Sequence, residues 1–159
     1  MNEQFKKCRE HATHKHMLKL RVYLPYIIAD ILRQDVQENK VHILNYNLSL
    51  GQGLHPVATL KIRINDADYE ETASGDGQYD AFMKALRRIY KDHLHRDFPM
   101  LTNYAVTIPP GGRTDAFVQT FISWEYRGQS FKTRGLDADQ TEAAIKATLK
   151  MLNKIENMQ

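Results

Sequence analysis

The chain has 159 residues, of which 42% are hydrophobic, and a formal net charge of +3. That size suffices for one ordinary core, or for two half-size units that share one. No stretch approaches the roughly 20 apolar residues of a membrane span, and the polar start lacks the apolar run of a signal peptide. The 22 basic residues are interleaved with 19 acidic ones, which argues against a nucleic-acid-binding face. The single Cys8 has no partner for a disulfide or a CxxC motif, so we expect a cytoplasmic protein.

The first 38 residues are expected to be a polar lead-in followed by a connecting helix. From Pro25 to Gln37, apolar residues including Ile28, Ile31 and Leu32 recur at helical spacing, and proline is acceptable in a first helical turn. The pattern predicts a short N-terminal helix that docks through its apolar face. We place the domain that follows at residues 39–158.

Alternating apolar and polar residues predict three strands, over residues 41–50, 57–64 and 69–74. Glycines near residue 51 and an Asn65-Asp66 pair supply the turns between them. The apolar residues expected to share one face are Leu44, Tyr46, Leu48 and Leu50 in the first strand and Leu60, Ile62 and Ile64 in the second.

From Asp76 onward the period changes to that of a helix. Phe82, Leu86 and Ile89 fall at positions i, i+4 and i+7, with basic residues toward the solvent and the C-terminal end. This spacing predicts a helix of about four turns.

The second half of the chain repeats this order of elements. The hexapeptide from Asn45 to Leu50 recurs from Asn103 to Ile108, at an offset of 58 residues. The offset is 60 between Gly75 and Gly135, and small insertions in turns explain the drift. A second helix is expected over about residues 139–157. We therefore predict an α+β fold, a tandem βββα repeat with pseudo-twofold symmetry (units 41–95 and 100–157) and helices packed on antiparallel sheets.

A short acidic loop precedes each predicted helix. In the first loop, Gly75 and Gly77 would let the backbone approach a ligand, and the helix N-terminus would offer N–H groups to a carboxylate. Asp76 and Asp80 could meet an ammonium group, so this loop suits a zwitterion such as a free amino acid. The alternative is that Asp76 merely caps the helix beside a tight glycine turn. The second loop, from Leu136 to Asp139, has the acidic groups without the glycines.

The strand at residues 117–126 is apolar on both sides. Phe117 and Phe121 alternate with Val118, Ile122 and Trp124, so both faces of this strand are expected to be covered. Helices can cover one face, and a second subunit is the simplest cover for the other. We therefore expect a homodimer.

Other kinds of site have less support. The pairs His14 with His16 and His93 with His95 have metal-like spacing, but the sequence places no third ligand near either, and we predict no metal site. No nucleophilic triad can be assembled. Residues 26–91 have the element order of a double-stranded-RNA-binding domain, but Asp76 and Asp80 would repel phosphates where that fold needs positive charge.

Two motifs carry a resemblance to a known family. The stretches from Ser74 to Ala81 and from Arg134 to Ala143 resemble the C-terminal regulatory (allosteric, dimerisation) domain of the α-isopropylmalate, citramalate and homocitrate synthase family. The resemblance spans about residues 41–156, and the stretch from Pro25 to Leu32 is similar to the connecting segment that precedes the domain in some members.

The resemblance implies a doubled βββα domain that dimerises and binds an end-product amino acid, leucine or isoleucine, for feedback inhibition. No cofactor is implied for this domain. In the family the effector lies near the dimer interface, held by the helix-start loops and adjacent strands. Carried onto this chain, the effector-binding residues are Gly75, Asp76, Gly77, Tyr79 and Asp80 from the first repeat, and Leu101, Tyr104, Ile108, Leu136, Asp137 and Ala138 from the second.

The chain departs from the family in its length. The family's catalytic half is a TIM barrel of roughly 250 residues, for which 159 residues leave no room. The resemblance therefore implies a chain that is not an enzyme by itself and that acts on a catalytic TIM-barrel domain or a separate synthase. A dimerisation or scaffold module without ligand binding is the alternative within the same fold.

Overall fold

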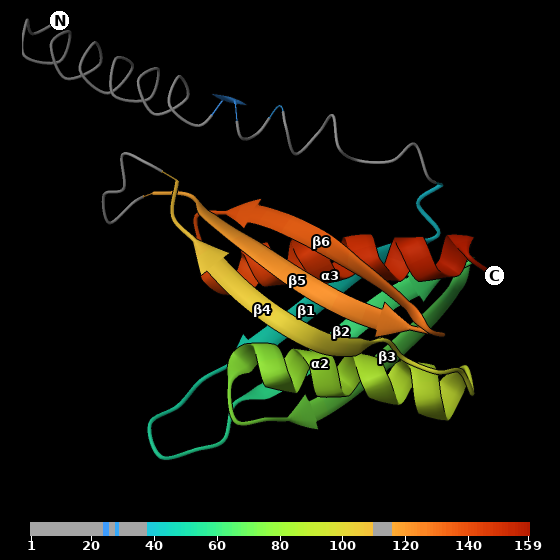
Figure 1. Cartoon of the computed structure of the whole chain (residues 1–159). Helices are drawn as coiled ribbons and strands as arrows, with labels where there is room; N and C mark the ends of the chain where they lie inside the picture. Colours follow the sequence, from blue (N-terminus) through green and yellow to red (C-terminus); the bar gives the residue numbers. More distant parts are fainter. Residues whose placement is uncertain (1–23, 26–27, 29–37, 110–115) are drawn as a thin grey trace, which may run out of the picture.

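Two three-stranded antiparallel sheets, each followed by a helix, form the part of the chain that the structure describes (Figure 1). This computed structural model describes residues 24–25, 28, 38–109 and 116–159. The predicted N-terminal helix therefore lies outside the described residues except for Pro25 and Ile28, which are helical.

The first repeat contains strands β1 (Val41–Ser49), β2 (Val57–Ile64) and β3 (Ala67–Ser74) and helix α2 (Gln78–Arg88), which continues as a π-helical turn, η1 (Ile89–His93). The second contains β4 (Met100–Thr107), β5 (Val118–Tyr126), β6 (Gln129–Asp137) and α3 (Gln140–Asn157). The strand orders are β1-β2-β3 and β4-β5-β6. The predicted tandem βββα fold is confirmed.

The two repeats share local irregularities as well as element order. The β1–β2 ladder skips one residue at Leu44, and the β4–β5 ladder skips one at Thr102, 58 positions later. Each second hairpin closes through a two-residue turn with positive φ, at Asn65-Asp66 and at Arg127-Gly128. Turns of this kind match the twist of the strands that they join. The two halves of the chain therefore share individual bulges and turns as well as the order of their elements.

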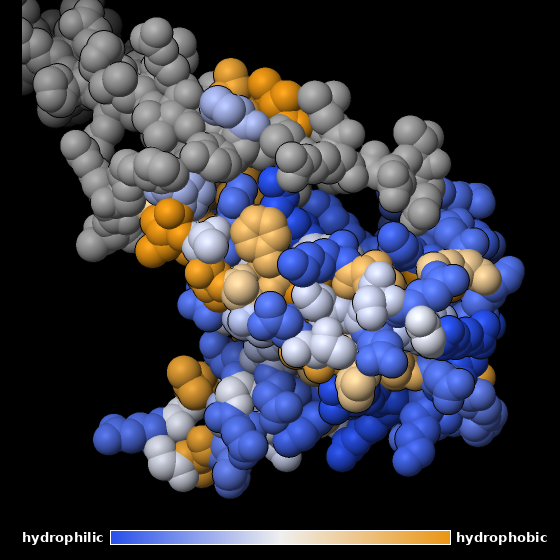
Figure 2. All heavy atoms as spheres, in the orientation of Figure 1, coloured by the Kyte–Doolittle hydropathy of each residue, from blue (hydrophilic) through white to orange (hydrophobic). Residues whose placement is uncertain are grey.

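The bulge corrects one detail of the predicted first strand. Leu44 was expected to share the buried face with Tyr46, but the extra residue turns it outward, and it is 40% exposed. Ile43 packs against the core instead. Leu50 lies beyond the end of β1 and is 70% exposed, and Leu54 in the same loop is 74% exposed. Figure 2 shows hydrophobic atoms on this loop between β1 and β2, at the lower left.

Helix α3 lies between the two sheets, whereas α2 packs on the first sheet (Figure 1). Helix α2 contacts all three strands of the first sheet, and α3 contacts β5 and β6 on one side and β1 on the other. In Figure 1 the sheet β4-β5-β6 lies in front of α3, with β1 and β2 behind it, and both helices begin at the left end of the molecule. The largest fully buried side chains include Trp124, Phe82 and Leu60. Residues from both repeats thus form one shared core.

Two glycines allow the helices to lie close to the ends of the sheets. A Cβ atom on Gly135 would lie 1.8 Å from the carbonyl oxygen of Ala143 in α3, and one on Gly75 would lie 2.4 Å from the amide nitrogen of Ala81 in α2. Because real Cβ contacts are never this short, only glycine fits at either position.

The described part of the chain contains no helix with the length and apolar character that crossing a membrane requires.

Candidate functional site

The start of α2 has no capping side chain. Gly77 occupies the N-cap position in an extended conformation, and the first intrahelical bond runs from the amide of Ala81 to the Gly77 carbonyl. The amides of the first turn, from Gln78 to Asp80, therefore point out of the helix without a side-chain acceptor from the N-cap. Such a helix start carries partial positive charge and suits an anion.

The start of α3 is capped by the chain itself. A carboxylate oxygen of Asp139 accepts hydrogen bonds from the amides of Thr141, at 2.8 Å, and Glu142, at 3.0 Å. The two helix starts, which occupy equivalent places in the repeats, therefore differ: one donates its amides to an internal carboxylate, and the other does not.

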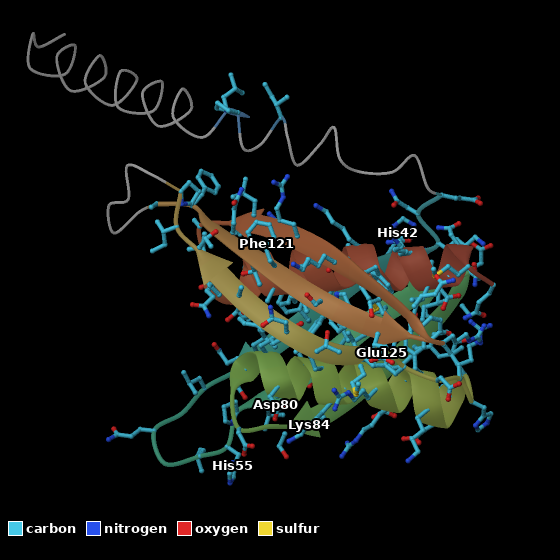
Figure 3. All side chains as sticks on the ribbon, in the orientation of Figure 1. His42, His55, Asp80, Lys84, Phe121 and Glu125 are labelled. Atoms are coloured by element: carbon cyan, nitrogen blue, oxygen red, sulfur yellow. The ribbon has the colours of Figure 1, made fainter. Side chains whose placement is uncertain are left out.

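Two aspartates lie beside the uncapped helix start, with different partners. The Asp80 carboxylate lies 2.8 Å from the Lys84 ammonium and accepts a hydrogen bond from the Asp76 amide. Figure 3 labels Asp80 and Lys84 as neighbours on α2. The hydrogen bond from Lys84, followed by that from the Asp76 amide, holds the pKa of Asp80 below its ordinary value. The carboxylate of Asp76 is exposed and has no hydrogen-bond or ion-pair partner within the described residues. Asp76 is thus the acidic group best placed to receive an added ammonium.

Aromatic side chains from both repeats meet behind this helix start. The ring of Tyr79 lies 5.7 Å from that of Tyr104 on β4, and its hydroxyl lies 2.8 Å from the Thr148 hydroxyl on α3. Burial raises the pKa of the Tyr79 phenol, so this side chain stays neutral at physiological pH. The α2 start is therefore backed by an uncharged aromatic surface.

The corresponding contact at the α3 start involves a tyrosine of the first repeat. The Tyr46 hydroxyl on β1 donates a hydrogen bond to the Glu142 carboxylate in the first turn of α3. Tyr46 and Tyr104 are 58 residues apart, the offset of the repeated strands. Tyr79 and Glu142 are 63 apart, which is also the offset between Phe82 and Ile145 in the two helices, so the two contacts occupy equivalent places in the repeats. Each helix start is therefore completed by a tyrosine of the other repeat. Sequence reasoning missed Tyr46 and Glu142, although the repeat offsets point to both.

The structure brings only part of the predicted effector site together. The first-loop residues are contiguous, but Gly75 is buried against Ala81 rather than open to a ligand. Leu101 lies on the same face of β4 as Tyr104, where they pair with Trp124 and Ile122 of β5. Ile108, past the end of β4, is 62% exposed.

The predicted residues of the second loop lie elsewhere within one chain. Leu136 pairs with Gln119, so it occupies the opposite face of the second sheet from Tyr104. Ala138 is exposed. The Asp137 carboxylate lies 2.6 Å from the Lys146 ammonium and accepts a hydrogen bond from the Asp139 amide. Partial burial by itself raises the pKa of Asp137, but these hydrogen bonds outweigh it, and the pKa lies below its ordinary value.

The described residues contain no group of three or more His, Cys, Asp and Glu side chains that could hold a metal ion. Of the histidines with metal-like spacing, His14 and His16 lie outside the described residues, and His93 pairs with Glu71 at 2.8 Å.

Comparisons with known proteins agree with this architecture. Residues 23–156 match the family described as the LeuA allosteric (dimerisation) domain. Among similar proteins, the 2-isopropylmalate synthase of Heliobacterium modesticaldum is 30% identical over 132 residues, which are 83% of this chain and 24% of that protein. The 2-isopropylmalate synthase of Pectobacterium atrosepticum is 29% identical over the same shares. A provisionally named (R)-citramalate synthase of Methanosarcina mazei is 26% identical over 81% of this chain and 26% of its own length.

The chain thus spans about a quarter of the length of the curated relatives that it matches. Because the family match covers most of the chain and the doubled βββα fold is present, this chain belongs to the LeuA allosteric (dimerisation) domain family.

Proposed function

We propose that this chain is the regulatory and dimerisation part of a 2-isopropylmalate or citramalate synthase, and that it binds leucine or isoleucine as a feedback effector. The chemical step would belong to a catalytic TIM-barrel domain or a separate synthase. The family description and the names of the relatives support regulation, dimerisation and this biosynthetic context. In this proposal the protein acts as a homodimer in the cytoplasm.

The observation that carries the proposal is the difference between the two helix starts. At α3 the first amides are bound by Asp139, whereas at α2 the N-cap Gly77 leaves them open. A free amino acid would place its carboxylate on these α2 amides and its ammonium on the Asp76 carboxylate, for which no partner is found in the described chain. Its apolar side chain would contact the aromatic surface of Tyr79 and Tyr104.

The remaining predicted residues would contribute to effector binding in different ways. Asp80 would add charge beside the ammonium while remaining paired with Lys84. Leu136 faces away from Tyr104 within one chain, so it would reach the effector only from the partner of a dimer. The alternative function, a dimerisation scaffold without an effector, shares the fold but does not explain why the α2 amides are left open.

Thermal denaturation with leucine, isoleucine and valine added in turn tests the proposal. An amino acid at 100 times its dissociation constant should stabilise the folded form by about 2.7 kcal/mol, which for a chain of this size raises Tm by roughly 5–10 °C. Asp76→Ala should abolish the shift, while Asp92→Ala, at an exposed aspartate of η1, should retain it. If none of the three amino acids shifts Tm, the chain is a scaffold. A full shift in Asp76→Ala would show that the ammonium binds elsewhere.

A further inference from the structure

The segment that leads into β1, residues 38–41, is fastened to the last turns of α3. The side chain of Asn153 bonds both backbone groups of Val41: its oxygen accepts from the amide at 2.9 Å, and its nitrogen donates to the carbonyl at 3.2 Å. The side chain of Asn157 donates to the carbonyl of Glu38 at 2.9 Å. The Lys40 ammonium donates to the backbone carbonyl of Glu156 at 3.2 Å. We call the three α3 residues Asn153, Glu156 and Asn157 the α3 clamp.

A buried carboxylate ties the α3 clamp to the end of α2. The Glu156 residue is 2% exposed, and its carboxylate accepts hydrogen bonds from the Tyr90 hydroxyl at 3.1 Å and from Asn65 at 3.2 Å. Arg96 forms an ion pair with it at 3.1 Å. A buried carboxylate is tolerated only when it is paired in this way. Because Tyr90 belongs to the π-helical turn η1 that ends α2, both helices terminate at one polar cluster.

The start of α2, at the opposite end of that helix from η1, forms the proposed effector site. At that end Tyr79 of α2 contacts Tyr104 and Thr148, and Glu142 of α3 accepts from Tyr46. Because Tyr79 contacts α3 at Thr148, α3 would carry a displacement over the five to nine residues from Thr148 to the α3 clamp, roughly 8–14 Å at 1.5 Å per residue. Figure 1 shows both helices running side by side from the end that carries their starts toward the C-terminus.

We propose that the α3 clamp is the output of the sensor: effector binding at the α2 start changes how firmly residues 38–41 are held at the opposite ends of the helices. This coupling rests on the effector site proposed above. In a full-length synthase, residues 38–41 would pass the change to the chain that precedes them. Coupling between two sites is reciprocal, so loosening the α3 clamp must change the affinity for the effector by the same factor.

Amide hydrogen exchange of the whole chain, measured with and without leucine or isoleucine, tests the coupling. The test variant combines Lys40→Met with Asn157→Ala, which removes the outer contacts of the α3 clamp and spares the buried Asn153 and Glu156. The matched control combines Lys61→Met with Asn47→Ala, at exposed positions of the first sheet. Calorimetric titration of the same amino acid into each protein measures its affinity.

In the wild-type chain and the control, the amino acid should change exchange of the amides at residues 38–41 by roughly fivefold or more. In the test variant these amides should exchange faster, and their exchange rates should no longer depend on the amino acid. The test variant should also bind the amino acid with an altered affinity. Binding without any change in exchange at residues 38–41, or equal affinities in test variant and control, would overturn the coupling alone. Absence of binding to the wild-type chain would overturn the effector site, and the coupling with it.

Discussion

Three aspartates near the helix starts perform three different roles. Asp139 caps α3, Asp137 pairs with Lys146, and the carboxylate of Asp76 has no partner among the described residues. In the sequence these residues look alike, since each lies in a short acidic loop before a predicted helix. Only the placement of the amides and of Lys146 separates a structural carboxylate from one that is open to a ligand.

At the same scale, Asp137 should make the stability of the fold depend on pH. Its folded-state pKa is depressed, so its contribution is present above its unfolded pKa of about 3.9 and disappears as the pH falls through the folded value. Asp137→Asn should therefore lower the free energy of unfolding at pH 7, and the difference from wild type should shrink below about pH 4. Urea unfolding at pH 7, 5 and 3.5 measures this. Lys146→Met removes the same ion pair and should show the same trend, whereas a difference that is constant with pH would contradict the assignment.

At the scale of elements, strand and helix positions were predictable because their signals are local. The alternation of β2 placed Leu60, Ile62 and Ile64 correctly in the core. The same alternation failed in β1, because it cannot reveal the extra residue that turns Leu44 outward. The equivalent bulge at Thr102 shows that the irregularity belongs to the repeated unit.

The close approach of each helix to its sheet gives a prediction for the repeated glycines. Gly75→Ala and Gly135→Ala should each lower the free energy of unfolding by about 2 kcal/mol or more, because the new Cβ forces the helix away from the sheet. Chemical denaturation compares them with Gly51→Ala, whose Cβ would meet only the side chain of Leu54. That control should change stability by less than about 0.5 kcal/mol. Equal effects at all three positions would show that backbone flexibility, rather than helix packing, explains the glycines.

At the scale of the whole molecule, the repeat predicted the architecture but not how its halves interlock. No local pattern indicates that α3 lies between the two sheets, or that Tyr46 reaches Glu142. The structure likewise brings together only some of the residues predicted to bind the effector: the α2 start and Tyr104 are neighbours, while Leu136 faces the other way. Sequence offsets could have found Tyr46, but the face that each strand turns toward the helices depends on long-range packing.

The central claim is that the open α2 amides receive the effector's carboxylate, and calorimetric titration of Gly77→Asp tests it most directly. The position is extended and its Cβ would meet no atom within 4 Å, so an aspartate there can cap α2 as Asp139 caps α3. The variant should be as stable as wild type, or more so by a few tenths of a kcal/mol. Because its carboxylate occupies the effector's place, the affinity for leucine or isoleucine should fall about tenfold or more, the loss expected for a charged hydrogen bond. An unchanged affinity in a folded Gly77→Asp chain would contradict the account.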